Sequence, residues 1–323
     1  MPLFCRRGNW MIGYWSTDLE EMDMRTDTQI NNELAHSSPY LHEMSEEESR
    51  NLKRMLLIML KDIASVCEKY ELTYMLCGGS CLGAVRHNGF IPWDDDLDII
   101  MPRSDYDRFA QLCLSGVLGP DYEMEAPNPK TDCKNTFMKV FRNGTLDEEL
   151  FNENTPFHKG IFVDIFPLEN ASSKDLIRKI HSGLSALLKF ISTSVLYVQY
   201  PSEGYHRFVS ASRPALKRYR FRLVVGTLFG WIPHRRWVYW FDRFNQSKRE
   251  TGFRSVSALD YYKEALPQEV FLPVRYSSFE GLSVPIPAQP DVYLTNLYGD
   301  YMQIPPEEKR GRHYVYKYRC PSV

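Results

Sequence analysis

The residues with the clearest chemical potential in this sequence are four aspartates within five positions, Asp94, Asp95, Asp96 and Asp98. Carboxylates this close repel one another unless water or a cation neutralises their charge. Alternate residues of a β-strand face the same side, so a strand that begins at Asp96 would direct the carboxylates of Asp96 and Asp98 together. Mg²⁺ prefers oxygen ligands and keeps positions for water and substrate phosphates. The cluster therefore predicts a site for one or two Mg²⁺ ions, or for Mn²⁺ in their place.

A glycine-bearing turn precedes this acidic cluster. Gly78, Gly79 and Ser80 stand between a predicted strand at residues 73–77 and a predicted helix at residues 81–87. Glycine lets the backbone approach a ligand closely, and the free N–H groups at the start of a helix bind phosphate. Together the two features indicate a nucleotide-phosphate site. A plain turn followed by a solvated acidic loop is the simpler interpretation, but the apolar residues on both sides of the aspartates disfavour it.

Two other templates for phosphate or nucleophile chemistry are absent from the sequence. It contains no GxxxxGK[ST] motif, which excludes a P-loop. Ser80 has Gly78 two positions before it but Leu82 two positions after it, so the GxSxG nucleophile elbow is missing as well. The candidate chemistry is thus that of carboxylates and a glycine turn acting on phosphate.

The chain of 323 residues, 43% of them hydrophobic, is long enough to bury one large core or two modest ones. A capping-box pattern at Ser45 predicts a helix over residues 46–70. Further periodic stretches predict a helix at residues 103–114 and strands at residues 137–141 and 160–166. This mixture predicts an α/β (α+β) fold with a mixed sheet and flanking helices.

The formal net charge of −2 hides an uneven distribution along the chain. Residues 174–254 are rich in lysine and arginine and hold only four acidic residues, whereas the remainder is acidic overall. We expect a flexible acidic leader at residues 1–44 and a catalytic domain formed by residues 45–173 and 255–323. Residues 174–254 would then be a basic, aromatic helical insertion within that domain.

The basic insertion admits two interpretations. It could be a solvated helical addition, or it could touch a membrane peripherally with tryptophans at the interface and arginines on anionic lipid. The aromatic candidates are Trp231, Trp237, Tyr239 and Trp240, and the flanking arginines are Arg218, Arg220, Arg222, Arg235 and Arg236. Nucleic acid is not an expected partner, because no RNA or DNA module accompanies the charge.

The distribution of cysteines and apolar residues bears on the location of the protein. The seven cysteines are scattered, without a CxxC pair, which is typical of reduced thiols in a cytosolic protein. The sequence shows no signal peptide and no uncharged apolar run of about 18 residues. We expect a cytoplasmic protein, with peripheral contact to the inner face of the membrane if the insertion binds lipid.

The stretch from Gly78 to Asp98 resembles the LicD family, which includes the fukutin-related proteins. The matching residues are Gly78-Gly79-Ser80 and residues 82–87, 89–96 and 97–98. Further similarity lies at Lys139, Thr145, residues 163–168 and 294–302, Pro305, Pro306 and His313. The resemblance covers roughly residues 46–170 and 279–316 but neither the leader nor the basic insertion.

The resemblance implies a nucleotidyltransferase-like fold and a phosphotransferase for substituted phosphate groups. Such an enzyme transfers a phospho-alcohol from a CDP-linked donor to a hydroxyl of a glycan. In this family the donor is CDP-choline in bacterial cases and CDP-ribitol in the fukutin-related proteins. The acceptors are cell-envelope glycans, such as lipopolysaccharide or teichoic acid, or their lipid-linked precursors.

The resemblance also implies roles for individual residues. Asp96, Asp98 and Asp164 would be catalytic, and together with Asp94 they would ligate the metal. Asp164 would lie on a strand next to the acidic pair and would either ligate metal only or also accept the proton of the acceptor hydroxyl. The implied substrate contacts are Gly78, Gly79, Ser80, Arg86, Lys139 and His313.

Three of these substrate contacts keep a simpler interpretation. Arg86 could serve only to pair with a carboxylate, Lys139 could lie on the surface, and His313 could be solvated among its basic neighbours.

Two alternative functions remain open. A nucleotidyltransferase that moves a nucleoside monophosphate to a small molecule or protein would use the same glycine turn and acidic pair. Release of CMP would support phospho-alcohol transfer, whereas release of pyrophosphate would support nucleotidyl transfer. A membrane-associated binding protein with a degenerate site is the non-enzymatic alternative, and the presence of every expected carboxylate disfavours it.

Overall fold

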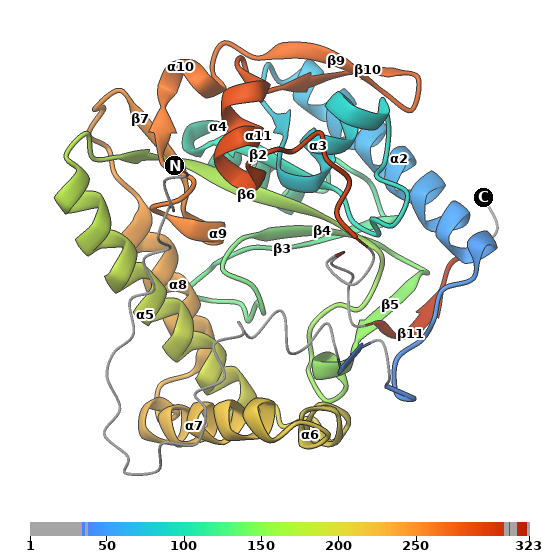
Figure 1. Cartoon of the computed structure of the whole chain (residues 1–323), viewed down its shortest axis with the longest axis vertical. Coiled ribbons are helices and arrows are strands. Elements are labelled where there is room, and N and C mark those ends of the chain that lie inside the picture. Colours follow the sequence, from blue (N-terminus) through green and yellow to red (C-terminus); the bar gives the residue numbers. More distant parts are fainter. Residues whose placement is uncertain (1–33, 36–37, 307–309, 311–314, 322–323) are drawn as a thin grey trace, which may run out of the picture.

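The computed structural model of the protein describes residues 34–35, 38–306, 310 and 315–321. In this part of the chain a mixed sheet of seven strands forms the centre of the molecule (Figure 1). The strand order is β1-β2-β6-β4-β3, and β7 pairs with the end of β6 and with β8. The bounds are β1 (Met75–Leu76), β2 (Asp98–Pro102), β3 (Tyr122–Glu125), β4 (Met138–Arg142), β6 (Phe162–Ala171), β7 (Phe253–Val256) and β8 (Leu266–Pro267).

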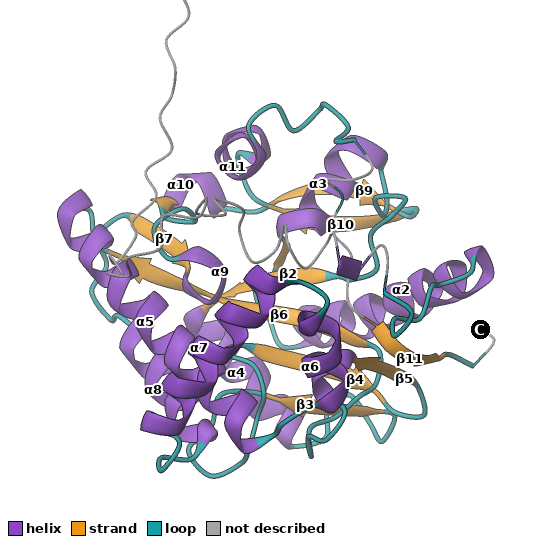
Figure 2. Ribbon diagram, turned by 60° about the horizontal axis from the view of Figure 1, so that its bottom comes forward, coloured by secondary structure: helices purple, strands orange, loops and turns teal. Residues whose placement is uncertain are grey.

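Helices and two small strand pairs surround this sheet (Figure 2). The helices before the insertion are α2 (Glu46–Lys69), α3 (Gly78–His87), α4 (Arg103–Leu114) and the 3-10 turn η1 (Leu150–Asn152). After the insertion come α9 (Ser257–Asp260), α10 (Gln268–Phe271) and α11 (Pro290–Tyr298). The strand pairs are β9 (Arg275–Phe279) with β10 (Leu282–Ile286), and β5 (Leu146–Glu149) with β11 (Val315–Arg319). The mixed α/β content confirms the predicted fold class.

Local sequence signals located two helices correctly. The Ser45 hydroxyl accepts the N–H of Glu48 at 3.2 Å, and the Glu48 carboxylate accepts the N–H of Ser45 at 2.8 Å, so the capping box forms and α2 starts at Glu46. One face of α2 packs into the main core through its own side chains Leu52, Met59 and Ile63. The helix predicted at residues 103–114 is confirmed as α4.

Two local predictions around the glycines and aspartates were wrong. Gly78, Gly79 and Ser80 do not form a separate turn, because the N–H of Cys81 donates to the carbonyl of Cys77 at 3.0 Å and closes the first turn of α3 around them. The strand β2 starts at Asp98, where pairing with β6 starts, so Asp96 lies in the preceding loop. The alternation of a strand therefore does not orient the side chain of Asp96.

Residues 174–254 form four helices, α5 (Asp175–Gln199), α6 (Glu203–Ser210), α7 (Arg213–Phe229) and α8 (His234–Asn245). After α8 the chain returns to the central sheet, where β7 pairs with the last four residues of β6. In Figure 1, α6 and α7 lie at the lower edge of the molecule, and the β9–β10 hairpin lies at the opposite edge.

A buried ionic network attaches α8 to the sheet. The guanidinium of Arg103, the first residue of α4, donates to the carboxylate of Glu169 in β6 and to Asp242 in α8, the latter at 2.8 Å. Glu169 is fully buried, and burial raises the pKa of its carboxyl to about 7 although the arginine opposes this rise. Removing one partner of such a buried pair costs about 3–5 kcal/mol, so this network fixes the insertion to the sheet.

Most of the expected leader at residues 1–44 lies outside the described part of the chain. Of the leader residues that the structure describes, the partly buried Leu34 and Leu41 pack against the cluster of Leu150 and Phe208. The N–H of His42 donates to the carbonyl of Val315 at 2.8 Å. The end of the leader is thus attached to the domain. No helix among the described residues is both long enough and apolar enough to cross a bilayer.

Candidate active site

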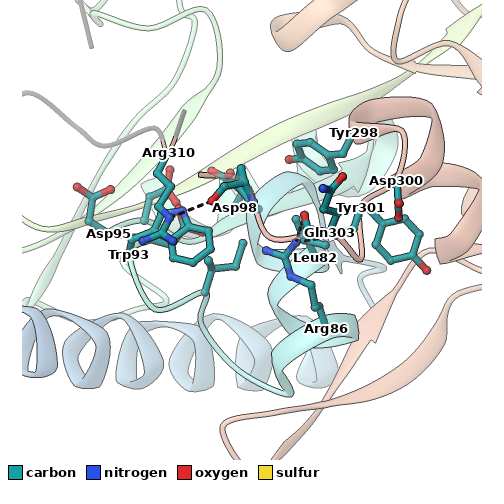
Figure 3. Close-up of a pocket in the computed structure, with 15 residues that line it drawn as sticks. Leu82, Arg86, Trp93, Asp95, Asp98, Tyr298, Asp300, Tyr301, Gln303 and Arg310 are labelled. Atoms are coloured by element: carbon teal, nitrogen blue, oxygen red, sulfur yellow. Dashed lines mark hydrogen bonds between the residues drawn. The ribbon is translucent and has the colours of Figure 1, made fainter. Parts of the chain in front are cut away.

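A cavity of about 540 Å³ lies beside the start of α3. It is formed by α3, the loop before β2 and the segment that follows α11. Figure 3 shows Asp95 on one side of the cavity and Tyr298, Asp300 and Tyr301 on the other, with Asp98 between them. The polar and aromatic lining residues are Arg86, Trp93, Asp94, Asp95, Asp96, Asp98, Tyr298, Asp300, Tyr301, Gln303 and Arg310.

The aspartates of this cavity are placed close enough to share a cation. Asp94, Asp95 and Asp96 each offer a carboxylate oxygen, and these oxygens lie within 4.8 Å of one another. All three side chains are partly exposed to the cavity. Hard oxygen donors at such spacing fit Mg²⁺ better than they fit a soft metal. They fit the larger hard divalent cations less well than Mg²⁺.

Two glycines at the start of α3 make room for the carboxylates. A Cβ atom at position 79 would stand 2.8 Å from Oδ2 of Asp94, which is closer than a side chain tolerates. Gly78 has φ +51°, and a Cβ there would lie 3.4 Å from Oδ2 of Asp98. The glycines therefore allow the backbone of the helix start to lie directly against the acidic cluster.

A row of charged residues crosses three neighbouring strands, and the first of these residues, Asp98, lines the cavity. Asp98 on β2 is in register with Asp164 on β6, and Asp164 is in register with Lys139 on β4. Residues in register on adjacent strands share a face of the sheet, so Asp164 lies on the face of Asp98. Nζ of Lys139 stands 2.9 Å from Oδ1 of Asp164 and 3.1 Å from the centre of the Phe162 ring.

The structure determines which side chains of the predicted site reach the cavity. Gly79, Arg86, Asp94, Asp96 and Asp98 line it, whereas Gly78 and Asp164 are not among its lining residues. Ser80 is buried, and its hydroxyl accepts the N–H of Asp98 at 2.9 Å, so it fixes the start of β2 instead. Lys139 is 6% exposed, which rules out the surface interpretation. His313 lies outside the described residues.

Arg86 is held by the segment after α11. Its guanidinium donates to the carbonyl of Tyr301 at 2.6 Å and to Nε2 of His87 at 2.9 Å. Partial burial lowers the pKa of the arginine, and Tyr298 partly offsets this effect. These contacts orient a cation along the wall of the cavity.

Several lining residues were not among the predicted site residues, including Trp93, Asp95 and Arg310. The guanidinium of Arg310 lies 4.2 Å from the centre of the Trp93 ring, which places a second cation next to the acidic loop (Figure 3). Asp95 belongs to the acidic cluster recognised in the sequence, but the family resemblance implied no role for it. Arg310 carried a sequence signal, since it belongs to the basic stretch around His313, but its contact with Trp93 depends on the fold.

A buried tyrosine and a buried carboxyl group lie next to the start of α3. The N–H of Gly78 donates to the hydroxyl of Tyr293 at 3.2 Å, and Glu264 lies next to that tyrosine. Glu264 is 5% exposed, and burial raises the pKa of its carboxyl to about 8, with Asp260 adding to the rise. This group is protonated at neutral pH and adds no negative charge behind the aspartates.

The part of the chain that carries these features matches a known domain family. Residues 71–182 match the family described as LicD/FKTN/FKRP, nucleotidyltransferase domain. The matched stretch includes α3, the acidic loop, β2 and Asp164. In this stretch the chain is therefore similar to the LicD family.

Relatives of known and unknown activity share this similarity. The chain is 27% identical over 279 residues to the lipopolysaccharide cholinephosphotransferase LicD of Haemophilus influenzae, covering 82% of this chain and 96% of that protein. An uncharacterized protein of Rickettsia typhi is 37% identical over 71 residues, 22% of each chain. An uncharacterized protein of Rickettsia prowazekii is 34% identical over 83 residues, 26% of this chain and 31% of its own.

Proposed function

We propose that the protein is a cation-dependent transferase that moves phosphocholine from a CDP-linked donor to a hydroxyl of a cell-surface glycan or its lipid-linked precursor. The observation that carries this proposal is the group of aspartates in one cavity of a chain that aligns along 96% of a lipopolysaccharide cholinephosphotransferase. An alditol phosphate in place of phosphocholine is the second candidate for the transferred group.

The carboxylates fit a bound divalent cation. Asp94 and Asp96 would hold it from the loop, and Asp98 and Asp164 from the neighbouring strands, with Asp95 completing the oxygen cluster. When bound, Mg²⁺ neutralises the charge of a diphosphate and of the departing nucleotide. The support for this assignment is the close approach of Asp94 and Asp98 to the two glycines, because the helix start is shaped around these carboxylates.

The remaining polar groups of the cavity would bind and orient the donor. Arg86 reaches the cavity from α3 and Arg310 from the segment that follows α11, and each can donate to phosphate oxygens. The stack of Arg310 on Trp93 limits the freedom of that guanidinium. The N–H group of Gly79, which lines the cavity in the first turn of α3, is a further donor for phosphate.

The transfer step requires a proton acceptor for the attacking hydroxyl. The hydroxyl oxygen forms a bond to the phosphorus that carries the alcohol, and the bond from this phosphorus to CMP breaks as CMP leaves with the electron pair. We assign the hydroxyl proton to the carboxylate of Asp164. Lys139, at 2.9 Å, compensates the charge of this buried carboxylate before the proton arrives.

Assays of CMP release test the proposal. The full chain is incubated with lipopolysaccharide, Mg²⁺ and either CDP-choline, CDP-ribitol or CDP-glycerol. We expect CMP from CDP-choline, and at least a 100-fold lower rate after Asp96→Asn combined with Asp98→Asn. Glu47→Gln, an exposed acid of α2, is the matched control and should retain the wild-type rate. Wild-type activity in the double variant, or no CMP from any donor, would refute the proposal.

A further inference from the structure

Exposed apolar side chains gather on the helices of the insertion. On α7 and the turn that follows it, Val224 is 59% exposed, Leu228 65% and Trp231 80%. On α5 a second stripe comprises Leu176, Ile177, Ile180, Leu184 and Leu187. Isolated exposed apolar residues are common on proteins, but a contiguous set on neighbouring helices marks a surface that binds something.

The exposed face of α7 lies opposite the face that packs on α5. The contact between the two helices is tight, because a Cβ at Gly226 would lie 2.1 Å from the carbonyl oxygen of Ser194. Next to this contact the rings of Phe190 on α5 and Phe221 on α7 lie 5.8 Å apart. Phe190 is one helical turn from Leu187, where the α5 stripe ends. Val224 and Leu228, two residues on either side of Gly226, therefore lie on the face of α7 that points away from α5.

Positive charge accompanies the apolar residues on α7. This helix contains Arg213, Lys217, Arg218, Arg220 and Arg222 and no acidic residue. Lys217 and Arg220 are exposed and fall, at helical spacing, on the same face as Val224 and Leu228. A face with basic residues at one end and large apolar residues at the other is complementary to a surface that is both anionic and apolar.

Some of the aromatic and basic residues that the sequence suggested for membrane contact are buried or paired in the insertion. Trp237 is 7% exposed and packs against Phe229 and Trp240, so it belongs to the core of the insertion. Arg235 is half-buried and pairs with Asp132 at 3.5 Å. The outward-facing apolar group is instead Val224, Leu228 and Trp231.

We propose that the outer face of α7, with Trp231, binds the surface of an anionic lipid bilayer. The helix α7 lies along the interface, its apolar residues enter the boundary between headgroups and acyl chains, and Lys217 and Arg220 contact lipid phosphates. In Figure 1 α7 forms the lower edge of the molecule, where a flat surface can approach it. This surface does not depend on the proposed reaction.

Vesicle sedimentation tests this inference with the full chain. We expect the wild-type protein to bind vesicles that contain phosphatidylglycerol, to bind pure phosphatidylcholine vesicles at least 10-fold more weakly, and to lose affinity as salt rises. Leu228→Glu with Trp231→Glu should weaken binding at least 10-fold, and so should Lys217→Glu with Arg220→Glu. The matched controls are Leu114→Glu, a residue of α4 that is 64% exposed, and Lys61→Glu on the exposed side of α2.

Three results would overturn the inference. The first is vesicle binding that is equal in the α7 variants and their controls, or absent in the wild type. The second is a wild-type dimer that the α7 variants convert to a monomer while neither binds vesicles, which would make the face a contact between two copies. The third is vesicle binding that emerges only after deletion of residues 1–33. CMP release from soluble donor should persist in the α7 variants, so failure here is distinguishable from failure of the proposed function.

Discussion

Gly79 and Gly83 of α3 differ in the kind of atom that an added Cβ would meet. At Gly79 the nearest atom to a new Cβ is Oδ2 of Asp94, at 2.8 Å, which is the end of a side chain that can rotate away. At Gly83 the nearest atom is the carbonyl oxygen of Gly89, at 2.4 Å, which is fixed in the backbone. Gly79→Ala should therefore displace a carboxylate of the site, whereas Gly83→Ala should strain the fold.

The expected magnitudes separate the two variants. Alanine within a helix is favoured over glycine by about 0.5–1 kcal/mol, so Gly79→Ala should retain the wild-type free energy of unfolding or gain slightly. Displacing a carboxylate that holds a metal weakens its affinity by about 10- to 100-fold. Overpacking against the backbone at Gly83 should cost about 1–3 kcal/mol or more.

Thermal unfolding and a Mg²⁺ titration of CMP release measure the two effects on the same samples. Gly79→Ala should unfold near the wild-type temperature and require at least 10-fold more Mg²⁺ for half-maximal activity. Gly83→Ala should unfold at a lower temperature and show an unchanged Mg²⁺ requirement in its folded fraction. A Gly79→Ala enzyme with the wild-type Mg²⁺ requirement, or one that fails to fold, would refute the reasoning about Asp94.

Three further perturbations address the surroundings of the site. Because the pKa of Glu264 is raised from 4.5 to about 8, its contribution to stability is complete below pH 4.5 and is lost as the pH rises through 8. Glu264→Gln should therefore flatten the fall in melting temperature between pH 5 and pH 8, and parallel curves would contradict the assignment. Lys139→Met should lower the free energy of unfolding by about 3 kcal/mol because it leaves Asp164 buried without its cation, and adding Asp164→Asn should recover part of that loss in urea unfolding. A double variant whose loss equals the sum of the single losses would show that the pair is not coupled. Arg310→Ala should raise the KM for CDP-choline by about 3- to 30-fold with a smaller effect on kcat, whereas the exposed Arg319→Ala should change neither.

Local sequence patterns were sufficient for those parts of the fold that short-range interactions determine. Ser45 and Glu48 satisfy each other within one helical turn, so the start of α2 could be predicted from four adjacent residues. The two-residue strand β8 could not be placed in this way, because only its pairing with β7 defines it, whereas the strand predicted at residues 73–77 contains β1. The positions of Gly78 and Gly79 within α3 were misjudged because glycine normally ends helices rather than starting them.

The candidate site likewise combines residues that the sequence pattern identified with residues that only the fold brings together. The run of aspartates and the adjacent glycines are consecutive in the sequence, and their types and spacing alone pointed to a cation and phosphate site. The groups contributed by distant segments required the fold: Arg310 meets Trp93, and Tyr293 meets Gly78, only because α11 and the segment after it return to α3. The alternation argument for Asp96 failed because pairing with β6 starts at Asp98.

The most direct test of the central claim is to follow the two halves of the donor separately. CDP-choline labelled in the choline methyl groups and CDP-choline labelled in the cytidine are each incubated with the full chain, Mg²⁺ and lipopolysaccharide. We expect the choline label to enter the glycan together with phosphate, and the cytidine label to appear as CMP. Cytidine label in the product, pyrophosphate release from a nucleoside triphosphate, or no transfer of either label would contradict phosphocholine transfer at this site.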